Sequence, residues 1–417
     1  MTGFVRFRDD CFYDGRPAPV AGYLADRPCP LCGGGRHRPL LEFEDFQFYT
    51  DVCADVCDAG TPLSSRVTIR QVQCLSCFAA FMNPVFTPAG FAALFAKAGA
   101  SYGSSSHRQS EQIGWLEARG LLAPGRTLLD VGCFEGAFLG QLPAGIRGVG
   151  VDIDAPAIAR AALRHGAAGH RFVHADFESV ELDERVDTIT LFHVLEHLPH
   201  PVAVLRQLGR LAHPGTRLLV EVPVIENVIF GDVCGFLTVQ HLTHFSVGSL
   251  HNAVAAAGWR VIAAETMNGY NGYRVIAEPA AGETAAVAVP GDCGRVHAYL
   301  AGWHRALAGI EARVGGIGRP RCVLRGGGLH AEYLYHLTSL AAGEREFLVI
   351  DGDPLKQGQS WRGIPILGPE RLAGLDWSDT RILLSSYSHQ EPMREEARRL
   401  GIPDPAVLAL YDQVFRY

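Results

Sequence analysis

The chain has 417 residues, 48% of them hydrophobic, and a formal net charge of −7 at pH 7. Its length exceeds that of one typical domain, so we expect two or three domains with sizeable cores. The acidic balance disfavours nucleic-acid binding, which needs a basic surface, and favours a small-molecule substrate. No membrane-length run lacks charges and residues 1–10 hold no apolar signal segment, so we expect a cytoplasmic protein that does not contact a membrane.

The N-terminal region contains two C-x-x-C pairs. These are Cys29 with Cys32 and Cys74 with Cys77. Four thiolates can close a tetrahedral zinc site, and disulfides are unusual in a cytoplasmic protein. We therefore expect a zinc-binding module over residues 1–100, with a structural Zn²⁺ on these four cysteines. Cys53 and Cys57 lie between the pairs and could replace one pair, form a second site or remain thiols.

A polar segment rich in serine and glycine, residues 99–112, follows the cysteine module. One interpretation is a linker that leads into an N-capped helix from about Ser110. The other is a flap in which Tyr102 and the serines close over a ligand pocket. Both interpretations fit the residues.

Residues 126–136 form an apolar run that ends in Asp130 and is followed by Gly132 and Gly136. This pattern predicts a buried parallel strand, a tight turn and a helix that starts near Ala137. Glycines let a backbone approach a ligand closely, and a helix N-terminus offers N–H groups to an anion. The loop could bind a dinucleotide or S-adenosylmethionine, or it could be a packing turn that binds nothing.

Further apolar runs predict more strands, several of them followed by a polar residue. Asp152 follows the second run, 22 residues after Asp130, where an acid is expected to meet ribose hydroxyls. Asp176 and Phe177 follow the third run, and His193 follows the fourth. The predicted strands are residues 147–151, 172–174, 186–192, 218–222, 261–264 and 273–278.

Five motifs, in this order, resemble the class I S-adenosylmethionine-dependent methyltransferases. They are Leu-Asp-Val-Gly-Cys, Gly-Val-Asp, Ala-Asp-Phe, Phe-His-Val-Leu-Glu-His-Leu and Leu-Leu-Val-Glu-Val-Pro, between residues 129 and 223. The resemblance implies an α/β fold with a central, doubly wound, seven-stranded Rossmann-like sheet over residues 101–280. It also implies S-adenosyl-L-methionine as cofactor, with Asp130 at its methionine end, Asp152 at the ribose and Asp176 at the adenine amine. The expected cofactor-binding residues are Tyr102, Asp130, Gly132, Phe134, Gly136, Asp152, Ile153, Asp176, Phe177 and His193.

An insertion over residues 224–245 follows the fifth strand, where substrates of open α/β sheets bind, and we expect it to form a substrate cap. Methyl transfer is an in-line displacement that needs an aligned and deprotonated acceptor. Because histidine titrates near neutrality, His241 is the expected base and His244 the second choice, with Glu221 as an acid nearby. Either histidine could instead pack against the helix expected from Ser246.

Residues 281–417 alternate apolar runs with helical patterns, which predicts a small parallel αβ domain. Gly326, Gly328 and Ala331 match G-x-G-x-x-A, and Asp351 follows the next strand. This loop could bind a second nucleotide or be a packing turn. The expected strands are 322–325, 346–350 and 381–385, and the expected helices are about 296–314, from His330, and 392–400.

The order of these parts resembles the sugar C-methyltransferases of antibiotic deoxysugar biosynthesis, which combine a zinc module, a methyltransferase core and a C-terminal αβ domain. The resemblance implies a role in natural-product biosynthesis. It implies a nucleotide-linked keto sugar as the substrate, C-methylation of that sugar with His241 as base, and a purely structural zinc ion.

Three positions depart from these families. Phe134 stands where a middle glycine is usual, and we expect it to pack on the cofactor or beneath it. Thr238 and Gln240 stand where the sugar family has tyrosine and glutamate. A single histidine base suits methylation of an oxygen or nitrogen of a secondary metabolite, which is the alternative function. A non-catalytic or nucleic-acid-directed protein of the same fold is the third hypothesis. We expect a monomer or a homodimer.

Overall fold

The computed structural model describes residues 4–5, 24–47, 51–52, 66–91, 108–228, 231–281, 292–354 and 356–414. The interpretations of Tyr102, Cys53 and Cys57 concern positions outside these residues. Among the helices in the described part of the chain, none combines the length and the apolar character needed to cross a membrane.

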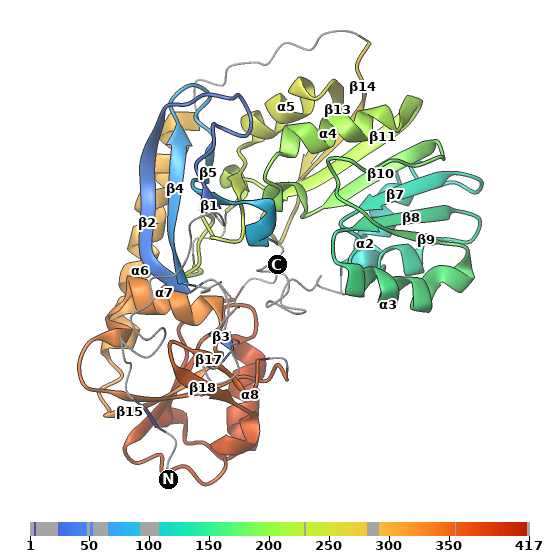
Figure 1. Cartoon of the computed structure of the whole chain (residues 1–417). Coiled ribbons are helices and arrows are strands. Elements are labelled where there is room, and N and C mark those ends of the chain that lie inside the picture. The colour runs from blue at the N-terminus through green and yellow to red at the C-terminus, as the bar shows by residue number, and fades with distance from the viewer. Residues whose placement is uncertain are drawn as a thin grey trace.

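A seven-stranded sheet forms the centre of residues 108–281 (Figure 1). Its strand order is β13-β14-β11-β10-β7-β8-β9, in which β14 is antiparallel to both of its neighbours and the other neighbouring pairs are parallel. All seven strands predicted from the apolar runs are present, which confirms a mostly parallel, Rossmann-like sheet. They are β7 (Thr127–Val131), β8 (Arg147–Asp152), β9 (Arg171–His174), β10 (Val186–Phe192), β11 (Ala212–Pro223), β13 (Trp259–Thr266) and β14 (Gly272–Pro279).

Helices cover both faces of this sheet. Neighbouring residues of a strand point to opposite faces, and here both faces carry apolar side chains that pack against helices. Leu128 of β7 shares one apolar cluster with Leu116 of α2, and Leu129 shares another with Leu205 of α4. Helix α2 is the helix expected from about Ser110, although no side chain caps its start. The helices are α2 (Gln109–Glu117), α3 (Ala155–His165), α4 (Pro201–Arg210) and α5 (Val247–Ala256).

The prediction of a helix near Ala137 was wrong. Only ten residues join Gly136 to the start of β8, and they form a single 3₁₀ turn, Leu139–Gln141. The ring of His165 lies so close to Gly140 that a side chain at this glycine would overlap it. Between β7 and β8, backbone N–H donors to a ligand therefore come from the glycine loop itself and not from a helix N-terminus.

The N-terminal cysteine region forms a four-stranded antiparallel sheet in the order β12-β5-β4-β2. Strand β12 comes from the predicted cap, where Thr243 pairs with Phe81 and His244 with Ala80. The cap is therefore fixed to the N-terminal sheet. The strands are β2 (His37–Gln47), β4 (Arg66–Cys74), β5 (Ala80–Met82) and β12 (Thr243–His244), with β1 (Leu24–Ala25) paired separately to β6 (Val85–Phe86).

The C-terminal region forms a second seven-stranded sheet, in the order β20-β19-β15-β16-β18-β17-β3. Its centre is parallel as expected, but β17 is antiparallel to β18 and to β3, a strand from the N-terminal region. The strands are β3 (Asp51–Val52), β15 (Arg321–Arg325), β16 (Glu346–Ile350), β17 (Gln359–Trp361), β18 (Ile364–Leu367), β19 (Thr380–Leu384) and β20 (Val407–Leu408). The helices are α6 (Asp292–Gly315), α7 (Leu329–Leu337) and α8 (Gln390–Arg399).

One apolar core joins the N-terminal sheet, the cap and the C-terminal region. It includes Phe46 of β2, Phe236 and Val239 of the cap, and Trp303 of α6. Tyr333 of α7 accepts a hydrogen bond from the Val239 N–H at 2.8 Å. Figure 1 shows α6 and α7 against the blue N-terminal sheet. The cap therefore rests on both flanking regions, which holds it in place beside the central sheet.

Candidate functional site

A cavity of about 1670 Å³ opens at the carboxyl ends of β7, β8, β9 and β10. The residues at or just after these strand ends line it, including Gly132, Asp152, Asp176 and His193. His241 of the cap and residues of the N-terminal region line it as well. Ligands of open α/β sheets bind at this edge, so the cavity is the candidate active site.

The loop after β7 has positive φ angles at three positions, a backbone conformation that favours glycine. Gly132 has φ +76°, and a Cβ at this position would overlap Val194. Phe134 also has a positive φ, +47°, and its N–H donates to Asp152 Oδ2 at 2.8 Å. That bond offsets the strain of a left-handed non-glycine residue and leaves Phe134 lining the cavity. Gly136, at φ +74°, packs instead, because a Cβ there would lie 2.6 Å from Phe172.

Three aspartates line the cavity at successive strand ends. Burial raises the pKa of Asp130 to about 7, although Thr190 donates to its Oδ1 at 2.8 Å. Burial likewise raises the pKa of Asp152. Asp176 is exposed, and Phe177 and Ile153 line the cavity beside it. Two buried carboxylates with raised pKa values favour a ligand that is cationic or donates hydrogen bonds.

His193 follows β10 with a positive φ of +54° and lines the cavity. Its Nε2 donates to Glu221 Oε1 at 2.8 Å, and its Nδ1 lies 3.2 Å from Glu196 Oε1. Burial lowers the pKa of His193, but these two carboxylates outweigh burial and raise it above its ordinary value.

Glu221 does not line the cavity. It is buried beneath His193, with Arg108 Nη1 at 3.0 Å and Arg274 also paired to it. Burial raises the pKa of Glu221, but His193, Arg274 and Arg108 together lower it to about 2. The expectation that Glu221 acts as an acid beside the substrate is therefore not supported. Its position holds His193 and Arg108 at the cavity wall.

Of the two candidate bases, only His241 lines the cavity. Burial, followed by the neighbouring His197 and His244, lowers the pKa of His241 well below the ordinary value, so it is neutral at pH 7. His244 lies in β12, with its Nε2 2.8 Å from Gln71 Oε1, and does not line the cavity. His244 is thus a packing residue, the alternative that was open for either histidine.

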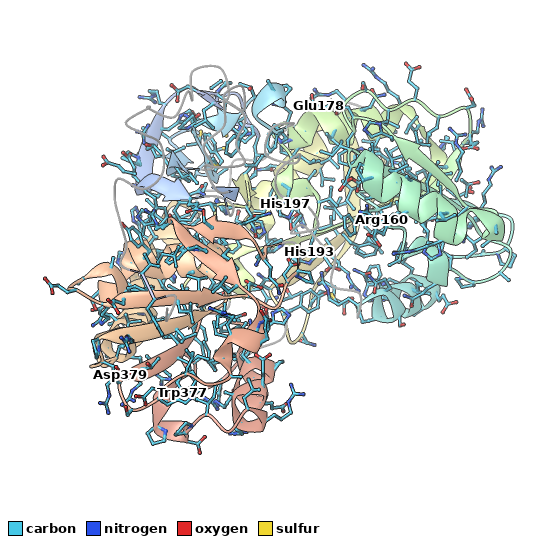
Figure 2. All side chains as sticks on the ribbon, turned by 60° about the horizontal axis from the view of Figure 1, so that its bottom comes forward. Arg160, Glu178, His193, His197, Trp377 and Asp379 are labelled. Atoms are coloured by element: carbon cyan, nitrogen blue, oxygen red, sulfur yellow. The ribbon has the colours of Figure 1, made fainter. Side chains whose placement is uncertain are left out.

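The sequence analysis did not single out Arg27, Arg108 or His197, which line the cavity. It also passed over Glu196, whose Oε1 lies 3.2 Å from His193 Nδ1. His197 lines the cavity, its Nδ1 donates to the Gln240 carbonyl at 2.9 Å, and its ring lies edge-on to that of His241 at 4.9 Å. Figure 2 places His193 and His197 near the centre of the molecule, where the green central domain meets the rest of the chain. The motif that contains Glu196 and His197 could have singled them out, whereas nothing in the sequence marks Arg27.

The four cysteines of the two C-x-x-C pairs come together, with their sulfurs all within 4.8 Å of one another. Cys29 Sγ lies 3.5 Å from Cys77 Sγ, and Cys32 Sγ lies 3.6 Å from Cys74 Sγ. Sulfurs about 2.3 Å from a tetrahedral zinc ion lie about 3.8 Å apart, so the spacing fits. Gly34 packs against this cluster, since a Cβ there would lie 3.2 Å from Cys74 Sγ.

The glycine loop of the C-terminal region is occupied by its own chain. The Gly327 N–H donates to Asp351 Oδ2 at 2.9 Å, and Lys356 Nζ lies 3.1 Å from the same oxygen. Gly326 has φ +112°, and a Cβ at Gly327 would lie 2.6 Å from Val349. These contacts favour the packing-turn interpretation of the G-x-G-x-x-A match.

In a comparison with known proteins, residues 106–264 match the model of a methyltransferase domain. The chain is 32% identical over 116 residues to the ubiquinone biosynthesis O-methyltransferase of Pseudomonas paraeruginosa, which is 26% of this chain and 49% of that protein. It is 33% identical over 111 residues to the enzyme of the same name from Pseudomonas putida, 25% of this chain and 47% of that protein. The chain thus spans about half the length of the curated relatives it matches.

Among solved structures, the chain is similar to an S-adenosylmethionine-dependent methyltransferase from Clostridium acetobutylicum. The TM-score is 0.37 at 10% identity, over 46% of this chain and 98% of that chain. The matched residues include the strands β7 to β11 and the loops after them, whereas β14 of the central sheet, residues 1–105 and the C-terminal region lie outside the match.

Proposed function

We propose that the protein is an S-adenosylmethionine-dependent methyltransferase that acts on a small molecule. One observation carries the proposal. The glycine loop, the strand-end aspartates and a neutral histidine of the cap all line the same cavity. The match of residues 106–264 to a methyltransferase domain supports the same conclusion.

The lining residues fit S-adenosylmethionine, which supplies an activated methyl group on a sulfonium. Asp130 and the loop around Gly132 suit the cationic methionine end, because the buried carboxylate gains from a nearby positive charge. Asp152 suits the ribose hydroxyls, and Asp176 with Phe177 suits the adenine. Phe134 is proposed to pack against the cofactor from the loop.

The transfer itself needs only alignment and removal of one proton. His241 takes the proton of the acceptor, and the electron pair left on the acceptor attacks the methyl carbon. The bond from that carbon to sulfur breaks, and its electron pair returns to the sulfur. The products are the methylated acceptor and S-adenosylhomocysteine, and the imidazolium of His241 then passes its proton to water.

The acceptor is proposed to be a nucleotide-linked keto sugar that is methylated at carbon, in natural-product biosynthesis. The support is the resemblance of the part order and the position of His241. The cavity volume of about 1670 Å³ also exceeds the roughly 300–1,000 Å³ that one ligand usually occupies, which leaves room for a large second molecule.

O-methylation of a hydroxylated metabolite is the second candidate, and two observations favour it. The matched relatives are named O-methyltransferases. Gln240, which cannot ionise, lines the cavity beside His241 where the sugar family has glutamate. An oxygen acid is easier to deprotonate than a carbon acid, so one histidine suffices for it.

The Cys29, Cys32, Cys74 and Cys77 cluster is proposed to hold one structural zinc ion. A closed set of four thiolates leaves no position for a substrate, so the ion would stabilise the fold and take no part in methyl transfer. The cluster lies next to β4 and β5, and the cap strand β12 pairs with β5, so the ion would also support the cap.

The test is an assay with methyl-labelled S-adenosylmethionine and two panels of acceptors, nucleotide-linked keto sugars and hydroxylated aromatic or sugar compounds. Formation of S-adenosylhomocysteine together with a labelled product supports the proposed activity. The position of the label, read by mass spectrometry and NMR, distinguishes carbon from oxygen. S-adenosylmethionine that does not bind at all would overturn the proposal.

A further inference from the structure

The Glu196 carboxyl group is buried and has incomplete partners. Its residue is 1% exposed, and neither carboxylate oxygen accepts a hydrogen bond from the described part of the chain. His193 Nδ1 lies 3.2 Å from Oε1, and His197 Nε2 lies 4.0 Å from the same oxygen. A buried carboxylate normally has its oxygens hydrogen-bonded or coordinated, so this geometry points to a missing ligand.

The tautomer of His197 is set by its backbone partner. A carbonyl oxygen can only accept, so the ring nitrogen Nδ1, 2.9 Å from the Gln240 carbonyl, carries the hydrogen. The lone pair is therefore on Nε2, the nitrogen on the Glu196 side. A hydrogen bond from one ring nitrogen to a backbone carbonyl is the usual way in which proteins orient a metal-binding histidine.

Glu196, His197 and His241 come together at this point. Each offers one ligand atom, and the three atoms all lie within 4.8 Å of one another. Ligands about 2.0–2.2 Å from one ion are separated by at most about 4 Å, so a small shift of the side chains closes the set. His197 and His241 also line the cavity, so an ion between them would have open positions toward a substrate.

We propose that Glu196, His197 and His241 bind one divalent transition-metal ion at the wall of the cavity. Two imidazoles and one carboxylate are typical of Mn²⁺, Fe²⁺ and Zn²⁺ sites. In one respect the inference rests on the proposed function: an acceptor oxygen bound to such an ion loses its proton more easily, a task that the metal-free enzyme leaves to His241.

The cysteine cluster requires a probe that separates the two sites. Mn²⁺ prefers oxygen and nitrogen ligands and competes poorly for four thiolates. The experiment is therefore a titration of the full-length protein, as purified, with Mn²⁺ alone, followed by electron paramagnetic resonance. We expect one tight Mn²⁺ site per chain. Glu196→Gln, which removes the ligand charge, should weaken it by at least about tenfold.

His241→Asn is the second variant, because it removes a ligand from the cavity wall and leaves the buried carboxylate in place. His200→Asn is the matched control, since His200 lines the same cavity outside the three-residue set. The control should bind Mn²⁺ like the unsubstituted protein. Mn²⁺ binding that is absent from the unsubstituted protein, or equal in all variants, would overturn the proposed site. Calorimetry on the same samples measures the binding of S-adenosylmethionine. It therefore tests the proposed function independently of the metal site.

Discussion

Arg27 donates from Nη2 to the carbonyl oxygen of Leu242 at 2.7 Å, so a residue two positions before Cys29 holds the segment that carries His241. The same guanidinium donates from Nη1 to the Pro199 carbonyl and from Nε to the Met82 carbonyl. The Leu242 N–H in turn donates to the Glu196 carbonyl at 2.7 Å. The N-terminal module thereby positions both histidine-bearing segments of the cavity.

Arg27→Met should weaken the attachment of the two histidine-bearing segments to the N-terminal module. It removes one donor from each of three carbonyls, of which that of Leu242 keeps the Met82 N–H at 3.0 Å. Hydrogen bonds from a charged group are worth about 1.5–3 kcal/mol, so the free energy of unfolding should fall by roughly that amount. Affinity for S-adenosylmethionine should stay close to that of the unsubstituted protein, because the strand-end aspartates are untouched. Chemical denaturation and calorimetry measure the two quantities. If the variant is as stable as the unsubstituted protein, Arg27 does not hold these segments together.

Zinc is expected at about one ion per chain, and Cys74→Ser should remove it. Binding energy at a closed thiolate site is also folding energy, so the melting temperature should fall with the metal content. Elemental analysis and calorimetric melting provide the measurements. Cys234→Ala, which changes a cysteine outside the cluster, should keep the zinc. Protein purified without chelator that contains no zinc would contradict the assignment.

Glu332 of α7 joins the N-terminal and C-terminal regions. It accepts from the Gln47 N–H at 2.7 Å and from Arg362 Nε at 2.9 Å, and it is fully buried. Burial raises the pKa of Glu332, but His336 and Arg362 outweigh burial and lower it. Its contribution to stability is therefore present above the pKa of an unfolded glutamate and is lost as the pH falls through the depressed folded value.

Glu332→Gln should lower the free energy of unfolding at pH 7 by about 3–5 kcal/mol, because it leaves the buried Arg362 without its partner charge. The difference between the variant and the unsubstituted protein should shrink at acidic pH, where the native carboxylate is also protonated. Urea denaturation at a series of pH values measures this. A difference that is constant from pH 7 to acid would show that the charge is not the cause.

His241→Asn should reduce turnover by about 10²–10⁴-fold, the usual contribution of a general base, and leave the affinity for S-adenosylmethionine nearly intact. His244→Asn is the comparison, since His244 packs in β12 and should affect stability more than turnover. Steady-state kinetics with the acceptor found in the labelled-methyl assay measures both. Normal turnover in His241→Asn would assign proton removal to solvent or to the substrate.

Much of the central sheet could be predicted because each buried parallel strand appears in the sequence as a short continuous run of apolar residues. Leu128 and Leu129 point to opposite faces and both are buried, so the run that contains them is continuously apolar. Asp152 and Asp176 were predictable for the same reason: they follow such runs, and the ends of parallel strands meet at one edge. The helix predicted near Ala137 does not form because only ten residues lie between Gly136 and the start of β8, which is too few for a helix and its connections.

The contacts between regions could not be predicted, because they join residues far apart in the chain. Strand β3 pairs with β17, and Thr243 pairs with Phe81, through backbone groups that every residue has. Arg27 reaches Pro199 and Leu242 through their carbonyl oxygens, which have no side-chain signature. Tertiary packing decides such pairings. For that reason Glu221 and His244 were assigned to the substrate, although both are buried behind the cavity wall.

Calorimetric titration with S-adenosylmethionine is the sharpest test of the proposed cofactor site, because it needs no knowledge of the acceptor. We expect one site per chain and a loss of affinity of about tenfold or more in Asp152→Ala, since hydrogen bonds to a charged carboxylate are worth about 1.5–3 kcal/mol. Asp183→Asn, which changes an exposed acid outside the cavity, should bind normally. If S-adenosylmethionine does not bind the unsubstituted protein, or binds Asp152→Ala equally well, this cavity is not its binding site.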